Sequence, residues 1–173
     1  QSPPITAREQ GENNQNKARI VNHGRQPDLN LLVHNREQPF RPIAHALFDE
    51  MLPLTTILIA NEDEARAFTG KEPGEALEEL ARRTPIAVVK LGKEGALIAR
   101  GGERVRVKAK KVQAIDTTGA GDLWASGFLT GWLKGDSLAT AGELGARCAA
   151  EVVQRVGAHL PPSVWSKIGS DDR

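Results

Sequence analysis

Short apolar runs rich in β-branched residues alternate along this chain with segments of helical periodicity. The runs at residues 55–61 (TTILIAN) and 85–91 (PIAVVKL) predict buried strands. Helical patterns are expected at residues 43–51, 75–83 and 123–133. Because strands that alternate with helices usually build α/β layers, we expect a largely parallel sheet flanked by helices, with ligands at the carboxyl ends of its strands.

A β-hairpin is predicted within residues 95–111, where Gly101 and Gly102 can close a two-residue loop. Its return strand places basic residues on one face and apolar residues on the other. We favour the interpretation that the basic row is a solvated sheet edge that discourages aggregation, and a phosphate-binding patch is the alternative. The basic residues are Arg104, Arg106, Lys108 and Lys110.

Capping residues predict where several helices begin and end. Asn61 with Glu64 three residues later is typical of a helix start, and Gly70 is expected to end that helix. Asp136 is expected to cap a final long helix that Gly157 ends.

The segment 123–133 predicts a buried helix that a neighbouring helix can approach closely. Trp124, Phe128 and Trp132 recur at helical spacing on one stripe, and Gly127 and Gly131 lie on the adjacent stripe. We therefore expect the two tryptophans to belong to the core. Trp165 is expected to pack on the domain as part of the tail.

Composition separates a polar segment from the domain. Residues 1–39 are rich in Gln, Asn, Arg and Pro and are expected to be poorly organised, so the domain is predicted to cover residues 40–173. The net charge of +1 does not favour nucleic acid as a partner. No apolar stretch approaches the ~20 residues needed to span a bilayer, and the single cysteine, Cys148, is expected to be a packed thiol. These two features predict a cytoplasmic protein.

A glycine turn directly before an apolar helix predicts a binding site for an anion. The amides of Gly119, Ala120 and Gly121 and of the first helical turn should point outward without intrahelical acceptors. Asp122, beside the bound anion, could accept the proton of a hydroxyl that attacks phosphorus. The alternative is that Asp122 only caps the helix.

The segment DTTGAGDLWASGF, residues 116–128, resembles the C-terminal signature of the ribokinase-like, or phosphofructokinase-B type, carbohydrate and nucleoside kinases. Neither the P-loop pattern nor the three-glycine dinucleotide fingerprint explains this segment. The resemblance implies that Asp122 deprotonates the substrate hydroxyl. It also implies that Gly119, Ala120 and Gly121 form an anion hole for the transferring phosphoryl group.

The same resemblance implies cation sites. Asp116 and Thr118 match positions that often bind a monovalent cation, usually K⁺. Asn61 and Glu64, in the sequence NEDE, match an Asn-x-x-Glu motif that organises Mg²⁺ and the nucleotide phosphates. From the residues alone, a helix cap with a glutamate at its third position is an equal alternative for this motif.

Two further segments resemble parts of the family's nucleotide site. In VKLGKEG, Gly92 and Gly95 match a turn that lies along the nucleotide, and Lys90 stands where Thr or Ser is frequent. An ordinary β-turn is the alternative for this segment. Gly145 and Ala149, on the last long helix, are expected to flank the adenine.

The resemblance covers roughly residues 40–168 and implies the C-terminal half of a ribokinase-like fold, without the lid and the N-terminal half. The implied activity is ATP-dependent transfer of the γ-phosphoryl group to a hydroxyl of a nucleoside, adenosine-like, or of a sugar, with Mg²⁺ and K⁺. The alternative is a catalytically silent remnant that binds nucleotide or a partner. A half-sheet leaves an open edge, so a homo-oligomer or a complementing chain is expected to cover it.

Overall fold

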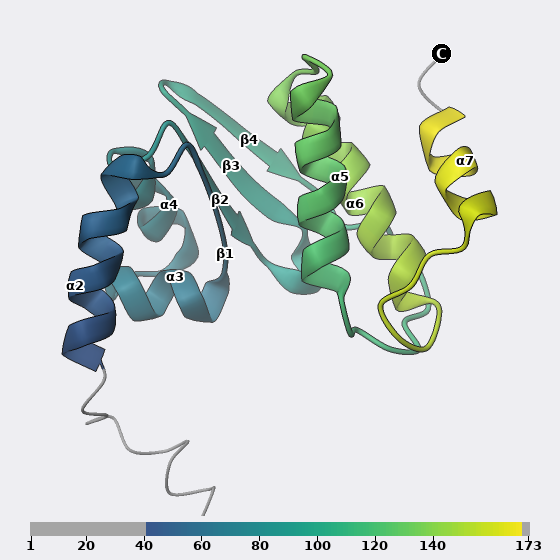
Figure 1. The fold of residues 1–173 in the computed structure, drawn as a ribbon, viewed down its shortest axis with the longest axis horizontal. Coiled ribbons are helices and arrows are strands. Elements are labelled where there is room, and N and C mark those ends of the chain that lie inside the picture. Colours follow the sequence, from purple (N-terminus) through teal and green to yellow (C-terminus); the bar gives the residue numbers. More distant parts are fainter. Residues whose placement is uncertain (1–40, 171–173) are drawn as a thin grey trace, which may run out of the picture. The chain divides into compact units, whose positions relative to one another are not determined.

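A four-stranded sheet forms the centre of the computed structural model, which describes residues 41–170 (Figure 1). The strands follow in chain order: β1 (Ile57–Asn61), β2 (Ile86–Lys90), β3 (Ala96–Arg100) and β4 (Glu103–Val107). The strands β1 and β2 are parallel, whereas β2, β3 and β4 pair in antiparallel fashion. The expected α/β layers are confirmed, but the sheet is mixed rather than largely parallel, because the predicted hairpin supplies two of its strands.

Within the described residues, the chain from 43 to 170 belongs to one compact unit. The segment 1–39, for which composition predicts little order, lies outside the described residues. None of the helices within residues 41–170 combines the length and the apolar character needed to cross a bilayer.

The central strand β2 is buried on both of its faces. Ile86 and Val88 belong to one core cluster, and Ala87 and Val89 belong to the cluster on the opposite face. This is why the strand reads as a continuous apolar run, since side chains alternate between two covered faces.

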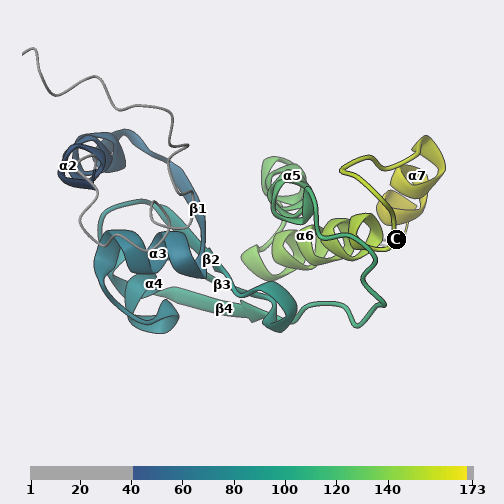
Figure 2. The same cartoon turned by 90° about the horizontal axis from the view of Figure 1, so that it is seen from below.

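One face of the sheet is covered by α3 (Glu62–Thr69) and α4 (Pro73–Ala81), which follow α2 (Arg41–Met51) and the short 3₁₀ helix η1 (Leu52–Leu54) (Figures 1 and 2). The predicted start of α3 is confirmed. The side chain of Asn61 accepts a hydrogen bond of 2.8 Å from the amide of Glu64, and the Glu64 carboxylate accepts one of 2.8 Å from the amide of Asn61. Gly70 ends the helix in the left-handed conformation, with φ of 70°.

The opposite face is covered by α5 (Ala120–Leu133) and α6 (Leu138–Val153), which pack closely on each other (Figure 2). A Cβ atom at Gly127 would stand 2.8 Å from Cys148 Sγ, and one at Gly145 would stand 2.7 Å from the carbonyl oxygen of Trp124. Trp124 stacks on Phe128 with ring centroids 5.4 Å apart. The predicted close approach and the packed Cys148 thiol are confirmed, and burial raises the pKa of that thiol.

The residues that begin and end α6 differ from those predicted. Ser137, not Asp136, caps α6 and accepts a hydrogen bond of 3.1 Å from the amide of Thr140. Asp136 still belongs to the turn after α5, because its amide donates to the carbonyl oxygen of Gly131. The helix ends at Val153, so Gly157 lies beyond it and does not end it.

A further helix, α7 (Pro162–Ser170), follows α6, although the sequence did not predict it. Val164 and Ile168 pack it against α6 in a small apolar cluster. Trp165 is 43% exposed, so it packs on the domain only in part.

Three residues of the basic row, Arg104, Arg106 and Lys108, face solvent, in agreement with the favoured interpretation, whereas Lys110 lines the cavity described below. Arg104 and Arg106 are exposed, and they pair with Glu78 at 2.6 Å and with Glu94 at 3.4 Å. The loop between β3 and β4 consists of the two predicted glycines, of which Gly101 has a φ of 51°.

Candidate active site

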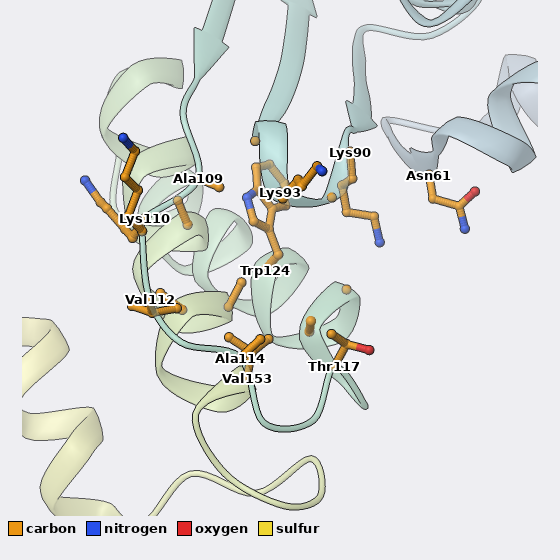
Figure 3. A pocket seen from close by; sticks show the side chains of 18 of the residues that line it. Asn61, Lys90, Lys93, Ala109, Lys110, Val112, Ala114, Thr117, Trp124 and Val153 are labelled. Atoms are coloured by element: carbon orange, nitrogen blue, oxygen red, sulfur yellow. The ribbon is translucent and has the colours of Figure 1, made fainter.

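A cavity of about 750 Å³ lies at the carboxyl ends of β1 and β2 (Figure 3). Its walls come from the start of α3, the end of β2, the 3₁₀ turn η2 (Gly92–Glu94), the loop before α5, and the helices α5 and α6. The sequence predicts a ligand site at this end of the sheet, and the cavity lies there.

The cavity has one apolar wall and a rim that carries charge. The apolar wall consists of Trp124 from α5 and of Ala146, Ala149, Ala150 and Val153 from α6. Four lysines from the end of β2, from η2 and from the loop before α5 line the cavity, and two acidic residues line it at the start of α3. The lysines are Lys90, Lys93, Lys110 and Lys111, and the acidic residues are Glu62 and Asp63. A ligand with a flat apolar part and an anionic part suits such a combination.

The turn that precedes α5 requires glycine at position 119. Gly119 occupies the N-cap position with φ of 75° and ψ of 0°, a conformation that side chains with a Cβ rarely adopt. A Cβ there would also stand 2.4 Å from the Cβ of Ala158. The turn is therefore held both by its own backbone conformation and by the segment after α6.

The amides at the start of α5 are only partly available to a ligand. The amide of Ala120 donates to the carbonyl oxygen of Thr117 at 3.1 Å, so the expectation that it points outward is wrong. The amides of Gly119, Gly121 and Asp122 have no acceptor among the described residues. The predicted anion site therefore loses the amide of Ala120. Among the free amides, only that of Gly121 belongs to a residue that lines the cavity, at the positive end of the helix dipole.

Asp122 is exposed at the third position of α5. It follows the cavity residue Gly121 but does not itself line the cavity. The N-cap residue is Gly119, and no side chain caps this helix, so the alternative that Asp122 is a cap is wrong. Within residues 41–170 its carboxylate accepts no hydrogen bond and forms no ion pair. The group is thus available to accept a proton.

Lys90 extends from the end of β2 toward the start of α5 (Figure 3). A Cβ atom added at Gly121 would stand 2.7 Å from Lys90 Nζ, so glycine leaves the space that the ammonium group occupies. Lys90 is half-buried. The sheet and the helix therefore bring a positive charge and the free amides of α5 together.

Asp116 and Thr118 form a tight turn just outside the cavity. Asp116 Oδ1 accepts hydrogen bonds from the amide and the hydroxyl of Thr118, at 2.9 Å and 2.7 Å, and Oδ2 accepts one of 2.8 Å from the amide of Gly157. The Gly157 amide is the largest cause that lowers the pKa of Asp116 to about 2, followed by the two donors of Thr118. The carboxylate is therefore ionised at neutral pH.

The cation ligands expected from the resemblance remain predictions. The hydrogen bonds described above leave lone pairs free on Asp116 Oδ2 and on the Thr118 hydroxyl, and oxygens of this kind coordinate monovalent cations. Among the described residues, no group of three or more His, Cys, Asp or Glu side chains is arranged to hold a metal ion. Glu64 is engaged at the start of α3 and does not line the cavity, whereas Asn61 does.

The glycines of the turn after β2 have different surroundings. A Cβ at Gly95 would stand 1.9 Å from the carbonyl oxygen of Val107, whereas one at Gly92 would meet nothing within 4 Å. Both glycines line the cavity. The requirement for glycine at position 95 therefore comes from the protein's own backbone, independently of any nucleotide.

Only one of the two α6 residues expected beside the adenine lies in the cavity wall. Ala149 lines the cavity, but Gly145 lies outside its lining, in the contact between α6 and Trp124. Sequence reasoning missed several residues that do line it: Glu62, Asp63, Lys93, Lys111, Val112 and Trp124. For Lys93, adjacency to Gly92 in the turn was an available signal, whereas Trp124 was assigned to the core because of its helical spacing.

The sequence pattern of the pfkB family of carbohydrate kinases matches residues 14–165, starting upstream of the resemblance described above. An uncharacterized sugar kinase of Archaeoglobus fulgidus is 38% identical over 119 residues, which cover 67% of this chain and 48% of the relative.

Solved structures of similar proteins agree with this match. Adenosine kinase from Sinorhizobium meliloti has a TM-score of 0.68 at 39% identity, over 73% of this chain and 40% of that protein. A ribokinase II from E. coli, in complex with ATP and Mg²⁺, has a TM-score of 0.62 at 25% identity, over 68% of this chain and 39% of that protein. The chain thus spans less than half the length of these relatives.

The fold, the glycine turn of α5 and these similarities lead to one conclusion. The family pattern covers most of the chain, and the neighbouring structures are sugar and nucleoside kinases with a ribokinase-like fold. This chain belongs to the pfkB family of carbohydrate kinases.

Proposed function

We propose that this chain carries the nucleotide-binding and phosphoryl-transfer part of an ATP-dependent kinase whose acceptor is a hydroxyl of a nucleoside or a sugar. The observation that carries the proposal is the start of α5, where the amides of Gly121 and Asp122 are free, Asp122 carries an unpaired carboxylate, and Lys90 Nζ lies against Gly121. Anionic phosphate and a hydroxyl that must lose a proton are the two partners that this arrangement can serve.

In the proposed reaction, an acceptor hydroxyl oxygen forms a bond to the γ-phosphorus of ATP as the bond to the bridging oxygen of ADP breaks. The acceptor proton passes to the carboxylate of Asp122, and ADP leaves with the bridging oxygen. The amides of Gly121 and Asp122 stabilise the charge on the transferring group, because donors already aimed at that charge need no reorganisation. A donor of this kind contributes about 10²- to 10³-fold in rate, and a positioned base about 10²- to 10⁴-fold.

ATP as the nucleotide is supported by the E. coli relative, whose structure contains ATP and Mg²⁺. The apolar wall of α6, with Ala146 and Ala149, is suited to a flat base, and the lysine rim is suited to phosphates. Bound Mg²⁺ would neutralise phosphate charge, and Asn61 and Glu64 are the residues proposed to organise it. Asp116 and Thr118 are proposed to bind K⁺.

An adenosine-like nucleoside is the proposed acceptor, supported by the 39% identity with the S. meliloti adenosine kinase. A second candidate is a nucleotide-binding module without transfer activity. It is motivated by the chain's span, which is 48% of the A. fulgidus relative and 40% of the S. meliloti structure.

The test is to incubate the purified chain with ATP, Mg²⁺, K⁺ and a panel of nucleosides and sugars, and to compare it with Asp122→Asn. Product from the wild type that falls at least about 10²-fold in the variant supports transfer with Asp122 as the base. Equal product from both proteins contradicts the role of Asp122. If neither forms product but ATP still raises the unfolding temperature, the nucleotide-binding module is supported.

A further inference from the structure

We propose that the free edge of β1 binds a second copy of this chain, so that the two sheets join by antiparallel pairing of their β1 strands. β1 is an outer strand, since β2 is the only strand among the described residues that pairs with it. An unpaired edge presents amides and carbonyl oxygens that another strand can bind. Dimerisation of this kind goes beyond the proposed function and does not depend on it.

The backbone groups of Ile57 and Ile59 point away from β2. The carbonyl oxygen of Thr56 accepts a hydrogen bond of 3.2 Å from the amide of Ile86, the first residue of β2. Successive residues of a strand direct these groups to opposite sides. Leu58 therefore bonds toward β2, and Ile57 and Ile59 face the free edge.

The free amides of this edge are bounded at both ends. The amide of Thr55 donates to the carbonyl oxygen of Leu52 at 3.0 Å, and the amide of Asn61 donates to the Glu64 carboxylate at 2.8 Å. Of the amides that face outward from this part of the described chain, only those at positions 57 and 59 are left without an acceptor.

Two free residues with this spacing are complementary to a second copy of themselves. In an antiparallel pair centred on Leu58 of both copies, Ile57 of each copy exchanges both N–H···O bonds with Ile59 of the partner subunit. The two-fold axis uses every free amide of the edge and leaves none for a third copy. The geometry therefore favours a closed dimer over an open fibre.

The β1 edge lacks the charges that protect the other edge of the sheet. The segment 52–61 contains no charged residue. The opposite edge strand, β4, carries Glu103, Arg104 and Arg106, and all three are exposed. Charged side chains of this kind are a common means of preventing edge-to-edge pairing, so β1 is the edge open to a partner.

Exposed apolar side chains belong to the helices on both faces of the sheet at β1. On one face, α5 shares a core cluster with Ile57 and Ile59. On the other face, α2 contributes Phe48 to the cluster against which Leu58 packs. The exposed residues are Leu129 and Leu133 on α5, Leu47 and Met51 on α2, and Leu54 in η1. An edge with apolar surface on both faces resembles the half of a core that stable homodimers bury.

The experiment measures the mass of the whole chain in solution by analytical ultracentrifugation, from about 1 to 100 μM. We expect a dimer whose population rises with concentration. Ile59→Pro should raise its dissociation constant by about 10-fold or more, because proline removes an outward amide and spares the bonds of Leu58 to β2.

Charge at position 54 tests the register. In the antiparallel pair, Leu54 of one copy comes next to Glu62 of the partner subunit, just beyond the ends of the two strands. Leu54→Glu should therefore raise the dissociation constant about 10-fold, whereas Leu54→Lys should leave it unchanged or lower it. Val156→Glu is the matched control, since Leu54 and Val156 are 87% and 84% exposed and Val156 lies beyond the end of α6.

A single-chain mass at every concentration overturns the proposal, and so does a dimer that Val156→Glu weakens as much as Leu54→Glu or that no variant weakens. Equal losses for Leu54→Glu and Leu54→Lys refute the antiparallel register. Hydrogen exchange adds a measurement without substitution, because the amides of Ile57 and Ile59 should gain protection as the dimer forms. Protection of both amides in the monomer would show that the same chain occupies the edge, and this also refutes the proposal. Circular dichroism confirms the fold of each variant.

Discussion

The carboxylate of Asp116 accepts a hydrogen bond of 2.8 Å from the amide of Gly157, which lies 41 residues further along the chain. This bond ties the loop before α5 to the segment after α6. The amides of Ile115 and Asp116 add to the link, because both donate to the carbonyl oxygen of Val153 at the end of α6. The glycine turn that carries the proposed base is therefore anchored from outside its own helix.

We expect the stability contributed by Asp116 to depend on pH in acid. The folded-state pKa is about 2, lowered from an ordinary value of 3.8, so the contribution is fully present above that ordinary value and disappears as the pH falls through about 2. Wild type should be more stable than Asp116→Asn at neutral pH, and the difference should narrow between about pH 4 and pH 2. Urea unfolding at several pH values measures this, and a constant difference across that window would contradict it.

In the turn after β2, alanine at position 92 and alanine at position 95 should destabilise the fold to different extents. Gly92→Ala should destabilise the fold by about 1–2 kcal/mol, because alanine must adopt the left-handed conformation but meets no neighbour. Gly95→Ala should cost about 3 kcal/mol or more, since its Cβ would overlap the carbonyl oxygen of Val107. Denaturant unfolding of the two variants gives the comparison, and equal costs would show that the hairpin can move away.

The close contact of α5 and α6 predicts a loss of stability for Gly145→Ala. Its Cβ would stand 2.7 Å from the carbonyl oxygen of Trp124 and 3.1 Å from the indole ring. We expect about 1–3 kcal/mol of destabilisation, because two backbones would have to separate. Gly74→Ala is the matched control in α4, where nothing lies within 4 Å, and alanine should be neutral or stabilise by up to about 1 kcal/mol. Thermal unfolding that ranks the two variants in the reverse order would refute the packing argument.

Glu64→Gln separates the helix cap from the proposed magnesium role. Glutamine at this position can still complete the capping box with Asn61, so stability should change by less than about 0.5 kcal/mol. If Glu64 organises Mg²⁺, the affinity for ATP should fall when Mg²⁺ is present and remain unchanged when it is absent. Glu75→Gln, an exposed glutamate on α4, is the control. Titrations that give wild-type affinity under both conditions would leave Glu64 with the capping role alone.

The elements with strong local causes could be predicted from the sequence. The strand 57–61 and the helix after it follow from an apolar run, the reciprocal cap of Asn61 and Glu64, and the left-handed Gly70. The boundary before α6 was harder, because Asp136 and Ser137 are adjacent and both are good caps. The amide of Asp136 donates to the carbonyl oxygen of Gly131, so Asp136 belongs to the turn that ends α5, and Ser137 is left to cap α6.

The start of α5 could be predicted as a site because its residues form a continuous motif. The other walls of the cavity could not, because no local motif marks them. Residues 116–122 run without interruption from the loop through the glycine N-cap into the first turn of α5, so the chemistry of Asp122 could be inferred from the order of residues. The proximity of Lys90 and Gly121 depends on how α5 docks on the sheet, which periodicity does not specify. Trp124 likewise satisfies the helical pattern of a core residue while its ring also faces the cavity.

Because Lys90 belongs to the sheet and Gly121 to the helix, a nucleotide held by both would act as a brace between two layers that pack mainly through apolar side chains. At a concentration 100-fold above its dissociation constant, such a ligand would add about 2.7 kcal/mol to the free energy of unfolding. Resistance to heat and to proteases would then report how much of the chain population is loaded with nucleotide, before any product is formed.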